Sequence, residues 1–251
     1  MPRYGLRDDQ WQRIKDLLPG RIGHVGVTAQ DNRRFVEAVL YRYRAGIPWR
    51  DLPERFGDWK NIHRRFSRWA KAGCGNGCLS TSPARPTTNT PCSTARSCGR
   101  TSTAPALPKK DEDPAIGKSR GGLSTKIHAL VDALGNPLAF LLTPGQTHDL
   151  VGADALLPQM AADTLIADKA FDADARVREP LAAAGKSAVI PPRPNRLTPP
   201  DFDRDLYKAR HLIENFFCKL KQFRAIATRY DKTARNFLAA IHLAAAIIWL
   251  N

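Results

Sequence analysis

The sequence predicts an α/β fold, a mixed sheet flanked by helices, preceded by an all-α module of helix-turn-helix-like character. Three observations support this prediction. Apolar residues recur at helical spacing through the first 73 residues, and a hairpin followed by strand, helix and strand is expected after residue 121. The length of 251 residues is also enough for one large domain or two smaller ones.

The chain is strongly basic, with 39 Lys and Arg against 24 Asp and Glu and a formal net charge of +15. This excess favours a polyanion as partner, nucleic acid ahead of an anionic membrane surface, and a basic protein with no special partner is the alternative. The N-terminus shows no apolar signal segment, and the apolar residues 237–250 are too few to span a bilayer. We therefore expect a cytoplasmic protein with no membrane partner, cysteines outside any disulfide framework, and a buried C-terminal helix.

Residues 1–73 are expected to form a helical DNA-binding module, and they hold 16 Lys and Arg against 8 Asp and Glu. Helical periodicity covers residues 7–18 and 32–45, with Gly46 as the end of the second helix. A short helix is expected to end at Gly57. Short helices followed by a basic helix are typical of a helix-turn-helix-like module.

The basic helix of this module is expected to begin after Asp58, a typical N-cap residue. Its apolar residues form one stripe, so the other faces can present cations to phosphates or base edges. The candidate DNA-binding cations are Lys60, Arg64, Arg65, Arg68 and Lys71. An ordinary amphipathic helix with a solvated basic face is the alternative.

The second half predicts strands over residues 124–131 and 138–143, joined by a turn at residues 135–137. A helix over residues 149–160, a strand ending at Asp168, a helix closed by Gly185 and a short strand within residues 186–192 follow. Asp168 stands where a buried strand emerges, a common place for a carboxylate that holds a metal or substrate. An Asp that only caps the next turn is the alternative there. For His148 and Asp149, a helix cap and a DNA contact are both open.

A charged pattern on a late helix is the most specific signal in the sequence. Its members are Tyr207, Arg210, Glu214 and Lys221. On a helix of 3.6 residues per turn they lie along one face, so a carboxylate and two cations can point to one site. A solvated row of salt bridges is the alternative.

The spacing Tyr-x2-Arg-x3-Glu-x6-Lys resembles the signature of bacterial insertion-sequence transposases of the DDE type. Two neighbouring segments are similar to the catalytic domain of that family: GGLSTKIHALVDALGNPLAFLLTPGQTHD and LIADKAFDAD. The N-terminal segments LRDDQWQRIKDLLP and RAGIPWRDLPERFGDWKNIHRRFSRW are similar to its DNA-binding region. A cysteine-rich run between these parts has no counterpart in the family.

The resemblance implies an RNase H-like fold for residues 121–251, in which three carboxylates hold two Mg²⁺ or Mn²⁺ ions. On the matching positions, Asp168 is the second acid and Glu214 the third. Arg210 and Lys221 are expected to contact phosphates or the terminal inverted repeat, and Tyr207 to stack or hydrogen-bond nearby. The resemblance also implies double-stranded DNA as partner, at terminal repeats and target, action as a homodimer, and a place at the bacterial nucleoid.

The first acid of this family ends an early strand, where apolar residues precede Asp-Ser-Thr, and this chain lacks that pattern. In its place, residues 74–108 contain no acid, aromatic residue, Val or Ile, but four of the five cysteines. A zinc site of these cysteines and a flexible Ser/Thr/Pro linker are two alternatives for the run.

We favour a compensated frameshift as the origin of the cysteine-rich run. When the third base of each codon is read with the first two of the next, residues 91–98 permit Met-Leu-Asp-Ser-Thr-Ile-Val. The permitted Asp codon straddles Ser93 and Thr94. The same offset permits a helical continuation, Val-Trp-Glu-Arg-Val-Phe, over residues 73–79, so one base lost near residue 73 and one gained near residue 107 would explain both.

Residues 74–120 are therefore expected to be a disordered segment in place of the first catalytic strand, with loss of buried area and ladder hydrogen bonds. The chain as written is expected to be a transposase polypeptide that cannot cleave DNA, because one of three acids is missing. A non-catalytic DNA-binding protein and an RNase H-like nuclease outside transposition are the alternatives.

Overall fold

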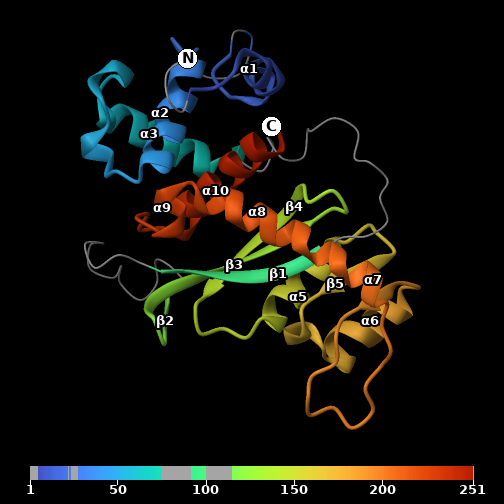
Figure 1. Ribbon diagram of the computed structural model, residues 1–251. Coiled ribbons are helices and arrows are strands. Elements are labelled where there is room, and N and C mark those ends of the chain that lie inside the picture. The colour runs from blue at the N-terminus through green and yellow to red at the C-terminus, as the bar shows by residue number, and fades with distance from the viewer. Residues whose placement is uncertain (1–4, 22, 24–27, 75–91, 100–114, 251) are drawn as a thin grey trace. The chain divides into compact units, whose positions relative to one another are not determined.

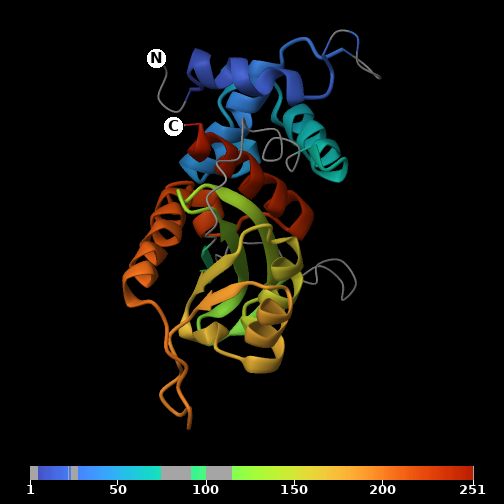
Figure 2. The same ribbon diagram turned by 90° about the vertical axis from the view of Figure 1, so that its right-hand side faces the viewer.

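The computed structural model describes residues 5–21, 23, 28–74, 92–99 and 115–250. Contacts divide the chain into two compact units (Figure 1 and Figure 2). The helical unit comprises the described residues up to 74 together with residues 219–250. The sheet unit comprises residues 92–98 and 115–218.

A mixed sheet forms the centre of the sheet unit, in the order β2-β3-β1-β5-β6 with β4 also paired to β3. Within the described residues its strands are β1 (Cys92–Gly99), β2 (Gly117–Ser119), β3 (Gly122–Val131), β4 (Pro137–Pro144), β5 (Thr164–Ala167) and β6 (Ser187–Val189). β3 is antiparallel to β2 and β4, whereas β5 is parallel to β1 and β6. The predicted mixed sheet is confirmed.

The hairpin of β3 and β4 is held by a side chain in its turn. The Oδ1 atom of Asp132 accepts hydrogen bonds from the backbone N–H groups of Leu134 and Asn136, each at 2.9 Å. Gly135 lies in the left-handed region at φ 83°, where a side chain would be strained. The predicted hairpin is confirmed, and each strand is slightly longer than expected.

Short helices and turns surround the sheet. They are α5 (Leu150–Leu156), η4 (Leu157–Gln159), η5 (Lys169–Phe171), the π-helical turn η6 (Asp174–Arg178), α6 (Glu179–Ala183), α7 (Arg204–Tyr207), η7 (Lys208–Arg210) and α8 (His211–Lys221). Leu165 of β5, Leu150 of α5 and Phe171 belong to one buried cluster. β5 is buried from Leu165 to Ala167, as expected of a strand between two parallel neighbours, so Asp168 is the first residue to leave the core.

The expectation that residues 74–120 lack regular structure is wrong at β1 and β2. Cys92 of β1 is level with Ile166 of β5, and Ser93 is level with Ala167. The physical reason is that ladder hydrogen bonds join backbone groups, which polar residues carry as well as apolar ones, so β1 pairs without an apolar sequence. The rest of the expected disordered segment, residues 75–91 and 100–114, lies outside the described residues.

The helical unit confirms the predicted N-terminal helices and their caps. Its elements are α1 (Asp8–Ile14), η1 (Lys15–Leu17), α2 (Asn32–Ala45), η2 (Trp49–Asp51), η3 (Glu54–Phe56), α3 (Trp59–Lys71), α9 (Arg224–Ala227) and α10 (Ala234–Trp249). Asp58 caps α3 by accepting a 2.9 Å hydrogen bond from the Lys60 backbone N–H. The short helix expected before Gly57 is instead two 3₁₀ turns, because Pro53 between them has no N–H to continue a helix.

The apolar C-terminal segment forms α10, which is buried along most of its length, as expected. Its contacts are with α2, α3 and α9, and they place it in the helical unit. Asn236 of α10 donates a 3.1 Å hydrogen bond to the Ser67 hydroxyl of α3. Within the described part of the chain, no helix is both long and apolar enough to cross a membrane.

A buried ion pair joins the early and late segments of the helical unit. The Arg42 guanidinium of α2 lies 3.3 Å from the Asp231 carboxylate, and these side chains are 2% and 4% exposed. The Tyr43 hydroxyl donates to the same carboxylate at 2.8 Å. The Arg42 guanidinium also stacks on the Tyr43 and Trp49 rings, 4.5 and 4.9 Å from their centroids. The two ends of the chain therefore share one polar, buried anchor.

We predict that Asp231→Ala lowers the free energy of unfolding by about 3–5 kcal/mol, because Arg42 is left as a buried charge without its carboxylate. The measurement is urea denaturation followed by circular dichroism. Asp8→Ala is the matched control, since Asp8 pairs with Arg33 at the surface, and it should cost at most about 1 kcal/mol. Equal losses in the two variants would contradict the anchor.

Among the residues that the structure describes, two histidines are buried, one in each unit. Burial lowers the pKa of His128 to about 4, and its Nε2 atom lies 2.8 Å from the Thr143 hydroxyl. Burial likewise lowers the pKa of His242 on α10 to about 4. Both rings are therefore neutral in the folded chain at pH 7.

The stability of the protein is predicted to fall as the pH drops from about 6.5 to about 4. In this range the two histidines bind a proton in the unfolded chain but stay neutral in the folded one. The expected loss is on the order of 3 kcal/mol for each histidine over this window. Urea denaturation at stepped pH measures it. His128→Gln should remove the part of this loss that comes from His128 and keep the part that comes from His242, whereas the same change at the exposed His211 should leave the loss as it is.

Candidate active site

The candidate site lies at the carboxyl end of β5, where Asp168 leaves the core. The Asp168 backbone carbonyl accepts a 2.9 Å hydrogen bond from Phe171, which closes the 3₁₀ turn η5 and fixes the exit of the chain. The Asp168 side chain is 33% exposed, so its carboxylate reaches the surface although the strand before it is buried. A rigid strand end of this kind holds a carboxylate in place better than a loop does.

Arg210 brings the two predicted acids together. Its Nη1 atom lies 2.7 Å from Asp168 Oδ1, and its Nη2 atom lies 2.7 Å from Glu214 Oε1. The guanidinium also lies 5.8 Å from the centroid of the Tyr207 ring. Asp168, Tyr207, Arg210 and Glu214 thus form one cluster, which we call the acid cluster.

The helical path to the acid cluster is not one regular helix. α7 ends at Tyr207, a 3₁₀ turn ends at Arg210, and α8 carries Glu214 in its first turn. Partial burial lowers the pKa of Arg210, but Asp168, Tyr207 and Glu214 outweigh this effect and raise it. Lys221 is exposed at the end of α8 and belongs to the helical unit.

The pairing of β1 with β5 ends directly before Asp168. Ser93 is level with Ala167, the last residue of β5, and Thr94 is the next residue of β1. Ser93 and Thr94 are the two residues that the offset codon for the first acid straddles. The backbone of β1 therefore pairs with β5 up to the residue before Asp168, at the point of the chain where the missing carboxylate is expected.

The described side chains do not complete a metal site. Asp168 and Glu214 supply the oxygen ligands that Mg²⁺ prefers, but both carboxylates are already paired with Arg210. No group of three His, Cys, Asp or Glu residues suited to a metal ion occurs among the residues that the structure describes. The donor set is therefore short of the three acids that the resemblance implies.

Five of the predicted DNA-binding cations lie on α3. Four of them are exposed: Lys60, Arg64, Arg68 and Lys71. Arg65 differs from the expectation because it packs inward, with its guanidinium 4.1 Å from the Phe35 ring centroid and in contact with Asn32. The apolar stripe of α3 is buried at Phe66 and Trp69, so the helix keeps its cationic side toward solvent.

His148 caps α5. Its Nδ1 atom accepts a 3.2 Å hydrogen bond from the Leu150 backbone N–H. Asp149 is paired with Lys126 of β3 at 2.7 Å. Of the two open roles for His148, the helix cap is the one seen in the structure.

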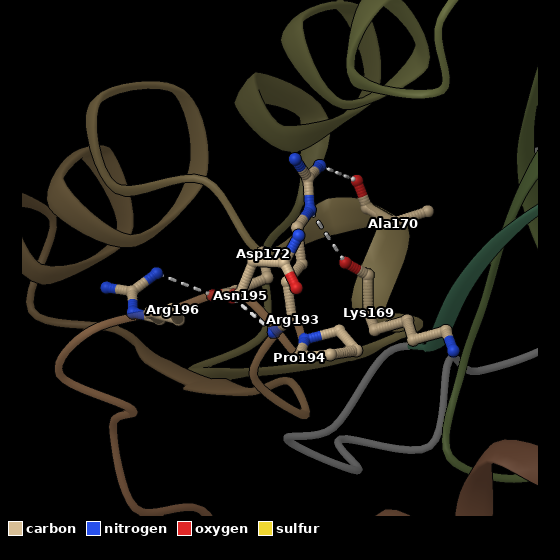
Figure 3. Close-up of a pocket in the computed structure, with 7 residues that line it drawn as sticks. All are labelled: Lys169, Ala170, Asp172, Arg193, Pro194, Asn195 and Arg196. Atoms are coloured by element: carbon tan, nitrogen blue, oxygen red, sulfur yellow. Dashed lines mark hydrogen bonds and ion pairs between the residues drawn. The ribbon is translucent and has the colours of Figure 1, made fainter.

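A second polar cluster near Asp168 was not predicted from the sequence. Asp172 is 4% exposed and lines a pocket of about 660 Å³ together with Lys169, Arg193 and Arg196 (Figure 3). Burial raises the pKa of Asp172, but hydrogen bonds from the Arg193 backbone N–H and Arg178, with the charges of Arg178 and Arg196, outweigh it and lower the pKa. The only signal in the sequence was the second and third acids of DKAFDAD, which have no periodicity to mark them.

Two protein families match the chain. The family described as "Putative transposase of IS4/5 family" matches residues 6–77, and the one described as "Transposase DDE domain" matches residues 93–249. The matches leave residues 78–92 uncovered, inside the cysteine-rich run. The second match takes in residues 93–108, which the frameshift hypothesis assigns to an offset frame.

Two curated relatives are similar over shorter stretches. "Putative transposase for insertion sequence element IS6501" from Brucella ovis is 45% identical over 131 residues, which are 51% of this chain and 100% of the relative. "Uncharacterized protein y4sN" from Sinorhizobium fredii is 46% identical over 69 residues, 28% of this chain and 55% of the relative. The chain thus spans all of the first relative and about half of the second.

We predict that Arg210→Gln strengthens Mn²⁺ binding by about tenfold, because removal of the guanidinium takes a competing ion pair and a repelling charge away from both carboxylates. Electron paramagnetic resonance of free Mn²⁺ measures the affinity. Arg204→Gln is the matched control, since it removes an exposed positive charge from α7 and should change the affinity little. Weaker binding in Arg210→Gln would mean that Arg210 orients the acids for a metal and does not compete with it.

Proposed function

The chain belongs to the DDE transposase family, in the IS4/5 group, and from this premise we propose that it recognises the terminal inverted repeats of its own insertion sequence. The proposed DNA contacts are the exposed cations of α3, namely Lys60, Arg64, Arg68 and Lys71, together with Lys221. The surplus of positive charge supports phosphate contacts, and binding through them should weaken steeply with salt. We also propose that the chain works in the bacterial cytoplasm at the nucleoid, as a homodimer on paired ends.

For catalysis, we propose that Asp168 and Glu214 are two of three acids of an RNase H-like strand-transfer site. The observation that carries this proposal is the register of β1, in which Ser93 is level with Ala167, the residue directly before Asp168. A carboxylate at residue 93 or 94 would join Asp168 at the same end of the parallel sheet. Such a set would hold Mg²⁺ or Mn²⁺ and supply the family's strand cleavage and transfer.

The chain as written is proposed to bind DNA without cutting it. Without a third carboxylate, and with Asp168 and Glu214 paired to Arg210, the described residues do not fit a pair of divalent ions. A non-catalytic DNA-binding protein that occupies the ends of the element is therefore the second candidate function. DNA sequencing across codons 73–108 shows whether the offset frame is present in the gene.

We predict that the chain as written leaves terminal-repeat DNA uncut in Mg²⁺ and that a frame-repaired chain cuts it. The repair adds one base near codon 73 and removes one near codon 107. Thr94→Asp in the unrepaired chain should allow weak cleavage, because it supplies a carboxylate on β1 one residue beyond the pair of Ser93 and Ala167. Gel analysis of end-labelled duplex measures the product.

Glu214→Gln in the repaired chain is the control and should abolish cleavage, because it removes the proposed third acid. Clean metal-dependent cleavage by the chain as written would overturn the proposal that it is inactive. A repaired chain that binds the ends but never cuts them would count against the proposed catalytic set.

A further inference from the structure

A basic pocket lies beside the acid cluster, on the segment that follows Asp168. It is lined by residues of η5 and by the loop after β6: Lys169, Ala170, Asp172, Arg193, Pro194, Asn195 and Arg196 (Figure 3). Lys169 is the next residue after Asp168, so the pocket and the acid cluster share one strand end. We call it the Arg193 pocket.

Asp172 is the base of the pocket and organises three arginines. Its Oδ1 atom accepts from Arg178 Nε and Arg196 Nη1, each at 2.9 Å, and its Oδ2 atom accepts from the Arg193 backbone N–H at 2.9 Å. Arg196 is also paired with Asp174. The charges of Arg178 and Arg196 are thus largely neutralised by carboxylates of the protein itself.

Arg193 differs from these two arginines because its guanidinium meets only neutral acceptors. Nη2 donates to the Ala170 carbonyl at 2.9 Å and Nε to the Lys169 carbonyl at 3.3 Å. Neither Arg193 nor Lys169 has a carboxylate within ion-pair distance among the described residues. Figure 3 shows the guanidinium standing over the η5 turn, while the Lys169 side chain extends away from it.

The guanidinium of Arg193 is therefore fixed in direction but not neutralised. Of its five N–H donors, the two carbonyl contacts occupy two, so three remain for a ligand. A planar, pre-positioned guanidinium of this kind matches the paired oxygens of a phosphate. The cations Lys169, Arg178, Arg193 and Arg196 also outnumber the acids Asp172 and Asp174 by two.

We propose that the Arg193 pocket binds a backbone phosphate of DNA next to the acid cluster. Arg193 would contact the phosphate, and Asp172 and Arg196 would act as positioning residues. This inference rests on the proposed function, because it names DNA as the source of the phosphate. A free phosphate shares the same chemistry, so the experiment has one arm for each source.

The first arm uses inorganic phosphate and the purified full chain. The melting temperature is measured by differential scanning fluorimetry in phosphate and in chloride of equal ionic strength. Phosphate is expected to raise the melting temperature of the chain as written, and Arg193→Gln is expected to abolish this rise. Arg120→Gln, an exposed arginine of the β2–β3 turn, is the matched control and should keep it.

The second arm measures binding of fluorescent duplex DNA by anisotropy over a range of salt concentrations. Arg193→Gln is expected to bind about tenfold more weakly and to reduce the slope of log affinity against log salt by about one. Arg193→Lys should keep most of the salt slope but bind DNA more weakly, because lysine keeps the positive charge and lacks the planar pair of N–H donors of the guanidinium. Far-ultraviolet circular dichroism checks that each variant is folded.

Each combination of outcomes decides the proposal. Loss of both responses in Arg193→Gln but not in Arg120→Gln supports a DNA phosphate in the pocket. Loss of the phosphate response with unchanged DNA binding assigns the pocket to a free phosphate and overturns DNA as its ligand. If the chain as written binds no DNA, the proposed function fails, and the phosphate arm still tests the pocket. If Arg193→Gln changes neither response, the proposal that the Arg193 pocket binds a phosphate is overturned.

Discussion

The parallel pairing of β1 with β5 is the constraint on which the acid cluster and its surroundings depend. It brings a strand from the first half of the chain level with Ala167, directly before the residue at which the core ends. The end of β5 and the residues of β1 therefore belong to neighbouring positions of one sheet. The cysteine-rich segment makes this backbone pairing without an apolar sequence.

Local rules predicted much of the fold. The caps at Asp58 and Gly46, the hairpin turn at Gly135 and the strand before Asp168 each depend on a few neighbouring residues, and all are present. β1 was missed because its sequence has no apolar pattern, and its pairing comes from a strand more than seventy residues later. Strand propensity depends only on the residues of β1, whereas its hydrogen-bond ladder depends on the neighbouring strand β5.

The residues of the site were predictable where a local pattern marks them, at the end of a buried strand or at helical spacing. Tyr207, Arg210 and Glu214 follow helical spacing, so their common face could be read from the sequence. The direct contact of Arg210 with Asp168 spans more than forty residues, and the contacts of Asp172 with Arg193 and Arg196 span more than twenty. Contacts between residues so far apart in the sequence leave no periodic pattern, so they could not be predicted. The inward packing of Arg65 on Phe35 could not be predicted for the same reason. Charge alone does not tell a ligand contact from an internal one.

The ion pair between Arg42 and Asp231 ties the order of synthesis to folding. α2 leaves the ribosome early, but its buried guanidinium meets a carboxylate only after almost all of the chain has been made. A product that stops in the cysteine-rich run would therefore keep the basic α3 and lose the partner that completes its unit. A single uncorrected change of frame would scramble Asp231 and α10 as well. Under the frameshift hypothesis, a return to the original frame near residue 107 would preserve the second half of the helical unit's core, even where the first catalytic strand is altered.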